Sequence, residues 1–221
     1  MMVRLGKPYR FVRTASAVAG LWVLAGLSSG CLAEWTQPRG QRGAAQATGD
    51  VSHRVTIGWL PARVQQYTPL LEAASMRHGV DANLLAIVVT VESGGDPQAV
   101  SPAGAKGLMQ IMPPTAMDIA KKRGLAIEEA QLHDPALNID FGAYYLAAQV
   151  RRFWGRTPEE TVAFAAGAYN GGPGRMRRHL ETGETLPAET VSYQRWVTGM
   201  WRERFMNRSA TFAAWYEAGG S

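Results

Sequence analysis

Cysteine is nearly absent from this chain: Cys31 is the only one among 221 residues. A single thiol can form no internal disulfide and cannot provide a cysteine-based zinc site. The four histidines also lack the spacing of metal ligands; they are His53, His78, His133 and His179. We therefore expect no metal and no cofactor, and a fold that is stabilised by the packing of its core.

Acidic side chains are missing from residues 1–33, where the basic ones are Arg4, Lys7, Arg10 and Arg13. An uncharged run over residues 14–33 follows this basic start and ends in small residues, which is typical of an export signal. When these four residues are subtracted from the 23 basic residues, 19 remain against 18 acidic ones. The sequence pI near 9.6 therefore reflects the first 33 residues rather than a surface built for a polyanion.

The end of this signal can be interpreted in three ways. Cleavage after Ala33 satisfies the small-x-small pattern and is the interpretation we favour. Residues 28–31 resemble a lipoprotein processing site in which Cys31 would be lipidated, although Ser28 stands where leucine is usual. The uncharged run also just reaches the roughly 20 residues that a membrane span needs, so a retained anchor is the third interpretation. All three predict a domain outside the cytoplasm, in the periplasm.

The sequence also lacks the alternating polar and apolar runs of strands, and the signals after residue 63 are helical. Residues 34–63 are rich in Gly, Gln, Ala and Arg and are predicted to be a flexible linker. Capping residues, prolines and glycines bound the predicted helices, which are 67–78, 82–93, 113–123, 135–154, 158–170 and 188–206. We predict an all-α domain over residues 64–206, followed by a C-terminal tail over residues 207–221.

Charge is scarce in residues 92–112, ESGGDPQAVSPAGAKGLMQIM, where Glu92 stands at the end of a strongly apolar helix. Apolar surroundings disfavour a carboxylate, and so does the partial negative charge at a helix C-terminus. Both effects predict a raised pKa for Glu92, and hence an acid able to donate a proton near neutral pH. The alternative is a helix-end glutamate whose side chain simply reaches solvent.

The residues that follow Glu92 suit an uncharged polar ligand. Glycines in this stretch let the backbone approach a ligand closely, and Ser101 and Gln110 offer neutral hydrogen bonds. A nucleic-acid groove would be rich in Lys and Arg, whereas this stretch carries only Lys106, so we expect a sugar chain and no nucleic acid. The alternative is a glycine-rich turn between two core helices.

The stretch ESGGDPQAVSPAGAKGLMQIMPPTA resembles the signature of the family 1 lytic transglycosylases, the soluble type with a goose-lysozyme-like helical domain. Three further segments resemble motifs of that family in the same order: HDPALNIDFGAYYL, AYNGGPG and PAETVSY. The four motifs lie between Glu92 and Tyr193, and the resemblance covers about residues 66 to 206. The fold that this resemblance implies is a compact lysozyme-like helical domain with glycine-rich loops that line a glycan groove.

The resemblance also implies a role for each matched position. The catalytic acid corresponds to Glu92, and Ser93 is the serine that follows it. The positions expected to bind the glycan are Ser93 itself and Ser101, Gly107, Leu108, Met109, Gln110, Tyr169, Asn170, Glu189 and Tyr193. Glu189 has an alternative interpretation, because the helix macrodipole favours an acid in a first helical turn without any function. Gly171 departs from the family, which commonly has alanine there.

The activity that the resemblance implies is non-hydrolytic cleavage of the β-1,4 bond between N-acetylmuramic acid and N-acetylglucosamine, which leaves 1,6-anhydromuramoyl ends. The implied partners are peptidoglycan strands, bound by a monomer during wall turnover or during local wall opening with components of a secretion, conjugation or pilus system. One alternative is a lysozyme-like peptidoglycan hydrolase in which Asp96 or Glu189 directs a water. The other is a non-catalytic glycan-binding scaffold module.

Two features lie outside these roles. The basic group at residues 175–179 is interpreted as a solvated helix face, with a contact to the carboxylates of peptide stems as the alternative. The tail carries Phe212, Trp215 and Tyr216, which we expect to pack on the domain. A contact with a partner or a membrane surface is the alternative for the tail.

Overall fold

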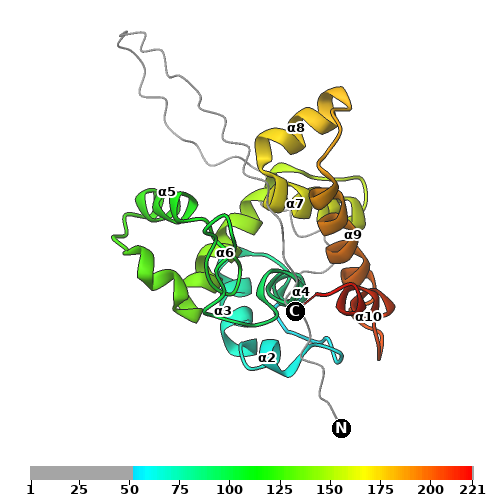
Figure 1. Ribbon diagram of the computed structural model, residues 1–221, viewed down its shortest axis with the longest axis horizontal. Coiled ribbons are helices and arrows are strands. Elements are labelled where there is room, and N and C mark those ends of the chain that lie inside the picture. Colours follow the sequence, from blue (N-terminus) through cyan, green and yellow to red (C-terminus); the bar gives the residue numbers. More distant parts are fainter. Residues whose placement is uncertain (1–51, 221) are drawn as a thin grey trace.

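The computed structural model describes residues 52–220, and the predicted export signal and residues 34–51 of the predicted linker lie outside the described residues (Figure 1). Within residues 52–220 the regular structure is helical, apart from two isolated bridges in the loop around Lys106. The predicted all-α class is confirmed. The elements are α2 (Ala62–Gln65), α3 (Thr68–His78), α4 (Ala82–Ser93), α5 (Pro113–Arg123), η1 (Glu129–His133), α6 (Pro135–Arg152), α7 (Pro158–Gly171), α8 (Pro173–Thr182), α9 (Ala188–Arg202) and α10 (Ala210–Glu217).

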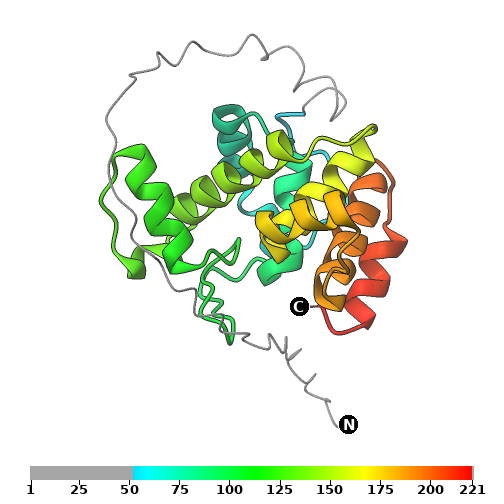
Figure 2. The ribbon, with the colours of Figure 1, turned by 90° about the horizontal axis from the view of Figure 1, so that it is seen from above.

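Helix α4 lies near the centre of the molecule (Figure 1). It contacts α2, α3 and α9, and every one of its residues except Glu92 is buried. A helix that is apolar on all sides is stable only inside a core, which explains why its sequence shows no polar face. In both views α5 and α10 lie at opposite ends of the molecule (Figure 2).

The predicted helix boundaries rest on local capping, and most of them are confirmed. The Asp81 side chain accepts hydrogen bonds from the backbone N–H groups of the first turn of α4, and Asp134 does the same for α6. Gly79, Gly94 and Gly124 end α3, α4 and α5 in the left-handed conformation that glycine adopts without strain. Short-range chemistry therefore sets where these helices start and stop.

Residues 52–63, predicted as part of a flexible linker, instead belong to the packed domain. Ile57 and Leu60 are 5% and 4% exposed and join the main hydrophobic core. Asn83 Oδ1 accepts a hydrogen bond of 2.8 Å from the backbone N–H of Thr56, which fixes this segment against the start of α4. The packed domain thus includes residues 52–63. The sequence did not indicate this, because isolated apolar side chains can be buried without any helical periodicity.

The predictions beyond residue 170 need three corrections. The GGPG segment, interpreted as a break, is a junction at which Gly172 ends α7 and Pro173 begins α8, a helix position that suits proline. Helix α9 ends at Arg202 rather than at Met206. The tail forms α10, on which Trp215 is 5% exposed and Phe212 is half-buried, as expected, whereas Tyr216 is 64% exposed.

Asp140 on α6 joins three helices through one carboxylate. Its Oδ1 lies 2.6 Å from Arg77 Nη1 and 2.7 Å from His78 Nε2, and its Oδ2 accepts a hydrogen bond from Arg123 on α5. Burial by itself would raise the pKa of Asp140, but the hydrogen bonds from His78, Arg123 and Arg77 outweigh it and hold the pKa well below its usual range. The carboxylate therefore stabilises the attachment of α5 to α3 and α6.

Asp140→Asn is expected to lower the free energy of unfolding by about 2 kcal/mol at neutral pH, because charge-assisted hydrogen bonds are lost. The folded pKa lies below the unfolded value near 3.9, so the contribution is complete above that value and is lost as the pH falls toward the folded pKa. Urea unfolding of wild type and variant at about pH 7 and about pH 3 measures this. If wild type and variant differed in free energy of unfolding by the same amount at both pH values, the lowered pKa of Asp140 would be contradicted.

None of the helices between Ser52 and Gly220 combines the length and apolarity needed to cross a bilayer. The same residues contain no group of three or more His, Cys, Asp or Glu side chains that could hold a metal ion.

Candidate active site

Glu92 occupies the last turn of α4, and it is the only residue of that helix that is not buried. Gly94 and Gly95 follow in left-handed conformation, with φ of 60° and 85°. A Cβ at Gly95 would stand 2.5 Å from the carbonyl oxygen of Arg63, so the chain can turn here only without a side chain. The end of a fully buried helix therefore delivers one carboxyl group to the edge of the core.

The loop that follows is held from beneath by Asn138 of α6. Its Oδ1 accepts a hydrogen bond of 2.7 Å from Met109 N, and its Nδ2 donates to the carbonyls of Lys106 and Leu132 at 2.9 and 2.8 Å. Asn138 is fully buried, so its side chain forms these bonds in the interior, where an unpaired polar group would be costly. Gly107 has a φ of 77° and leaves no room for a Cβ beside Asn138.

Gln110 is the one non-glycine residue with positive φ in the described part of the chain, at 48°. Its Nε2 donates to the carbonyls of Ala99 and Gly107 at 3.1 and 2.9 Å. These two bonds hold a left-handed conformation that costs other side chains about 1 kcal/mol or more. Such an outlier beside a cavity is consistent with a functional position.

The end of α7 closes the opposite side of the site. Tyr169 Oη donates a hydrogen bond of 2.8 Å to the carbonyl of Met109, so the AYN segment is attached to the glycine-rich loop. Asn170 Oδ1 accepts a hydrogen bond of 2.9 Å from Thr190 Oγ1 on α9. The ring of Tyr145 on α6 lies 5.4 Å from that of Tyr169 at an interplanar angle of 59°. Three helices and one loop thus meet beside Glu92.

A cavity of about 220 Å³ lies where these segments meet. Glu92 is the sole carboxylate among its lining residues, and no lysine, arginine or histidine is among them. Burial raises the pKa of Tyr145, and Arg152 offsets only part of this, so the phenol stays protonated at neutral pH. The lining residues are Glu92, Gln110, Ile111, Met112, Thr115, Tyr145, Tyr169, Asn170, Gly171 and Gly172.

Of the predicted site residues, the cavity brings together Glu92, Gln110, Tyr169 and Asn170. The others are not among its lining residues. Ser93 Oγ donates to the carbonyl of Leu108 at 2.9 Å and so supports the loop. Ser101 Oγ accepts a hydrogen bond from Ala105 N. The remaining ones are Gly107, Leu108 and Met109 in the buried loop, and Glu189 and Tyr193 on α9. Glycan binding by all of these residues stays a prediction.

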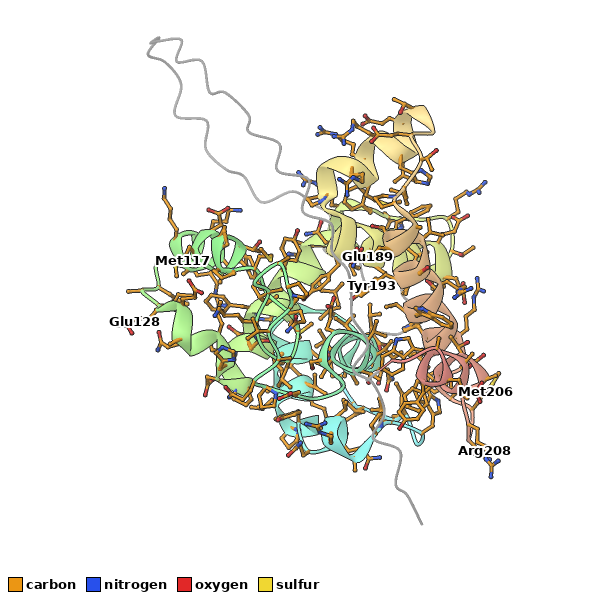
Figure 3. The ribbon with its side chains drawn as sticks, viewed as in Figure 1. Met117, Glu128, Glu189, Tyr193, Met206 and Arg208 are labelled. Carbon is orange, nitrogen blue, oxygen red and sulfur yellow. The ribbon has the colours of Figure 1, made fainter. Side chains whose placement is uncertain are left out.

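Glu189 and Tyr193 lie next to each other on α9, four residues apart and therefore on one face of the helix (Figure 3). Glu189 is half-buried in the first turn, and Tyr193 is 2% exposed. The residue between them that reaches the site is Thr190, through its bond to Asn170. Both predicted residues thus flank a contact with the cavity wall.

Sequence reasoning missed several lining residues, above all Tyr145. The signal was present, since Tyr145 is the tyrosine of the YL pair in the segment HDPALNIDFGAYYL. That segment also contains Gly142, where a Cβ would overlap the Met109 side chain. Met112, Thr115 and Gly172 also lie within quoted motifs, but only the fold shows that they line the cavity.

A second and larger groove, of about 760 Å³, lies between α7, α9 and α10. Its lining includes Arg195, Arg202 and Trp196 but no acidic residue. It therefore has no group that could act as a general acid, and the smaller cavity at Glu92 is the better candidate for an active site.

The chain is similar to several known proteins. It is 33% identical over 140 residues to the membrane-bound lytic murein transglycosylase C of Haemophilus ducreyi, with 61% of this chain and 38% of that protein covered. It is 36% identical over 131 residues to the protein of that name in Actinobacillus pleuropneumoniae, with 57% and 36% covered.

Two solved structures are also similar. The 70-kDa soluble lytic transglycosylase of Escherichia coli has a TM-score of 0.55 and 30% identity, over 66% of this chain and 25% of that one. An inactive mutant of the lytic transglycosylase Slt of Pseudomonas aeruginosa has a TM-score of 0.54 and 27% identity, over 65% and 25%. The chain thus spans about a third of the length of the curated relatives and a quarter of these structures.

Residues 69–191, more than half of the chain, match the transglycosylase SLT domain family. The chain belongs to this family, and the family resemblance predicted from the four motifs is confirmed.

Proposed function

We propose that this chain is a peptidoglycan lytic transglycosylase with Glu92 as its catalytic acid and base. The observation that carries the proposal is the single carboxylate of the cavity, delivered by the end of a buried helix and faced by neutral hydrogen-bonding groups. The relatives named lytic murein transglycosylase and the family match support the same activity.

The proposed reaction has two steps. Glu92 first protonates the oxygen of the β-1,4 bond between N-acetylmuramic acid and N-acetylglucosamine, and the bond to muramoyl C1 breaks. The muramoyl 2-acetamido group stabilises the positive charge that develops at C1. The Glu92 carboxylate then removes the proton from the C6 hydroxyl, whose oxygen bonds to C1. Glu92 ends protonated as it began, no water is consumed, and the product carries a 1,6-anhydromuramoyl end.

The lysozyme-like alternative needs a second carboxylate to hold a water or to form a covalent intermediate. None lines the cavity besides Glu92. Asp96 Oδ1 accepts a hydrogen bond of 2.9 Å from Gln98 N, which is the role of a turn residue. The geometry therefore favours the single-carboxylate mechanism.

Asp96→Asn is expected to retain activity within about twofold of wild type, because an amide oxygen can accept the same turn hydrogen bond. Release of soluble muropeptides from purified sacculi measures the effect. A loss comparable to that of a catalytic residue, about 10²-fold or more, would favour the hydrolase instead.

Tyr145→Phe is expected to lower the rate of muropeptide release about fivefold to tenfold, because one neutral hydrogen bond to the glycan, worth about 1 kcal/mol, is lost. Tyr144→Phe is the matched control, since Tyr144 packs against His78 and Arg123 rather than lining the cavity. Equal rates for the two variants would remove Tyr145 from the site.

The experiment that tests the proposed function is digestion of sacculi followed by mass spectrometry of the released muropeptides. Anhydromuramoyl ends support the transglycosylase. Reducing-end muramic acid would establish a hydrolase, and binding to sacculi without any release would establish a glycan-binding scaffold.

The biological setting is part of the proposal. We place the domain in the periplasm, where its substrate, the peptidoglycan strand, is found, and where it acts as a monomer. Its task is wall turnover, or local opening of the wall with components of a secretion, conjugation or pilus system. Activity of the purified chain on isolated sacculi, with no second protein present, would support a monomer that needs no partner for catalysis.

A further inference from the structure

The turn that leads from the last residue of α9 toward α10, residues 202–208, presents apolar side chains to solvent. Phe205 is 68% exposed and Met206 is 58% exposed, which places them among the most exposed large apolar side chains of the described residues. Figure 3 places Met206 at the opposite side of the molecule from Met117. Two adjacent side chains form only a small apolar tip, smaller than the patches that mark protein interfaces.

The turn keeps these side chains outside because its own backbone is fixed. The Glu203 carboxylate accepts hydrogen bonds from Ser209 Oγ and from Thr211 N and Oγ1 at the start of α10. Trp59 Nε1 donates to the carbonyl of Glu203 at 3.1 Å. The guanidinium of Arg204 lies 4.3 Å from the centre of the Phe205 ring, so this ring packs along the turn and stays outside the core.

The charges around the turn are positive on its outer side. Arg202 and Arg208 are exposed, whereas Arg204 is half-buried and lies between the rings of Trp201 and Phe205, 3.6 and 4.3 Å from their centres. The one acid of the turn, Glu203, is directed inward to α10. The turn thus combines two exposed apolar side chains with two exposed arginines, of which Arg202 also lines the groove between α7, α9 and α10.

We propose that this turn docks on the surface of an anionic lipid bilayer. Phe205 and Met206 would enter the boundary between head groups and acyl chains, while Arg202 and Arg208 pair with lipid phosphates. A stable protein partner would need to cover about 800 Å² of this chain, far more than two side chains offer. An anionic bilayer needs only a small apolar tip beside positive charge, so it fits the observed surface better.

Docking would also set the height of the active site. Helix α9 has 15 residues and so is about 22 Å long, with the turn at one end and Thr190, which contacts Asn170 of the cavity wall, at the other. The cavity is therefore held away from the bilayer, on the side where a glycan layer would lie. This inference concerns a separate surface and stands even if the proposed reaction is wrong.

A spin label at the turn tests the proposal in the full-length chain. The label is attached at Met206→Cys in a Cys31→Ser background, and vesicles of phosphatidylcholine with or without phosphatidylglycerol are added. With phosphatidylglycerol the nitroxide should become more accessible to oxygen and less accessible to a water-soluble nickel chelate. The label reports the turn itself, whatever residues 1–33 do at the membrane.

Two matched controls make the result decisive. A label at Met117→Cys, also exposed but at the opposite side, should stay accessible to water. Arg202→Gln with Arg208→Gln should weaken immersion of the label at residue 206 by about tenfold or more. A label at 206 that remains accessible to water in all vesicles would overturn the proposal. So would equal immersion at 206 and 117, or spin–spin broadening that indicates a second copy of the chain on the turn.

Discussion

Replacing Glu92 by glutamine is expected to lower the rate of muropeptide release from sacculi by about 10²- to 10⁴-fold, the range that a positioned general acid contributes. The amide has nearly the shape of the acid but can neither give up a proton to the glycosidic oxygen nor take one from the C6 hydroxyl. Glu92 is not part of the buried face of α4, so the variant should melt within about 2 °C of wild type.

Two measurements keep this prediction specific. Glu181→Gln on α8 is the control, because Glu181 is exposed and takes part only in a 4.0 Å pair with Arg177. The Glu92→Gln variant should still sediment with sacculi, which separates lost chemistry from lost binding. Unchanged release of muropeptides by this variant would show that Glu92 is not the acid.

Gly107→Ala is expected to lower the melting temperature by about 8–10 °C and to reduce activity strongly. The new Cβ would overlap Asn138 Nδ2 and the carbonyl oxygen of Leu132, and the residue would also be strained at a φ of 77°. Relief of that overlap has to break the bonds by which Asn138 holds Met109 and Lys106, so the loop beside Glu92 moves.

Gly104→Ala separates the two causes. Gly104 has a similar φ of 86°, but nothing lies within 4 Å of its added Cβ. This variant therefore carries only the backbone strain of about 1 kcal/mol, or about 3 °C, and should keep most of its activity. Equal losses of stability in the two variants would mean that Asn138 does not anchor the loop.

The helices could be predicted from the sequence because the signals that start and stop them are local. Asp81 and Asp134 bond to backbone N–H groups within three residues, and the glycines end helices at the positions where they stand. The packing of residues 52–63 has no such local signal, since Ile57 and Leu60 are buried by distant helices. Helix α8 was not among the predicted helices, although residues 175–179 were interpreted as a helix face, because Gly172 ends α7 and also stands directly before α8.

The site could be predicted only in part, for the same reason. Motifs identify residue types, but the cavity depends on contacts across the chain, such as that of Tyr169 with Met109, which are 60 residues apart. The hydroxyl of Ser93 supports the loop carbonyl of Leu108, a contact that the motif did not reveal, and its contact with the glycan stays a prediction. Tyr145 was part of a quoted motif, but only the packing of α6 against α7 places it at the cavity.

The oxygen balance of the reaction tests the central claim most directly. Sacculi are digested by the wild-type chain in water enriched in oxygen-18, and the muramoyl ends of the products are examined by mass spectrometry. Attack by the C6 hydroxyl predicts ends that lack one water and contain no oxygen-18. Reducing ends that carry one oxygen-18 atom per cleavage would contradict the single-carboxylate transglycosylase.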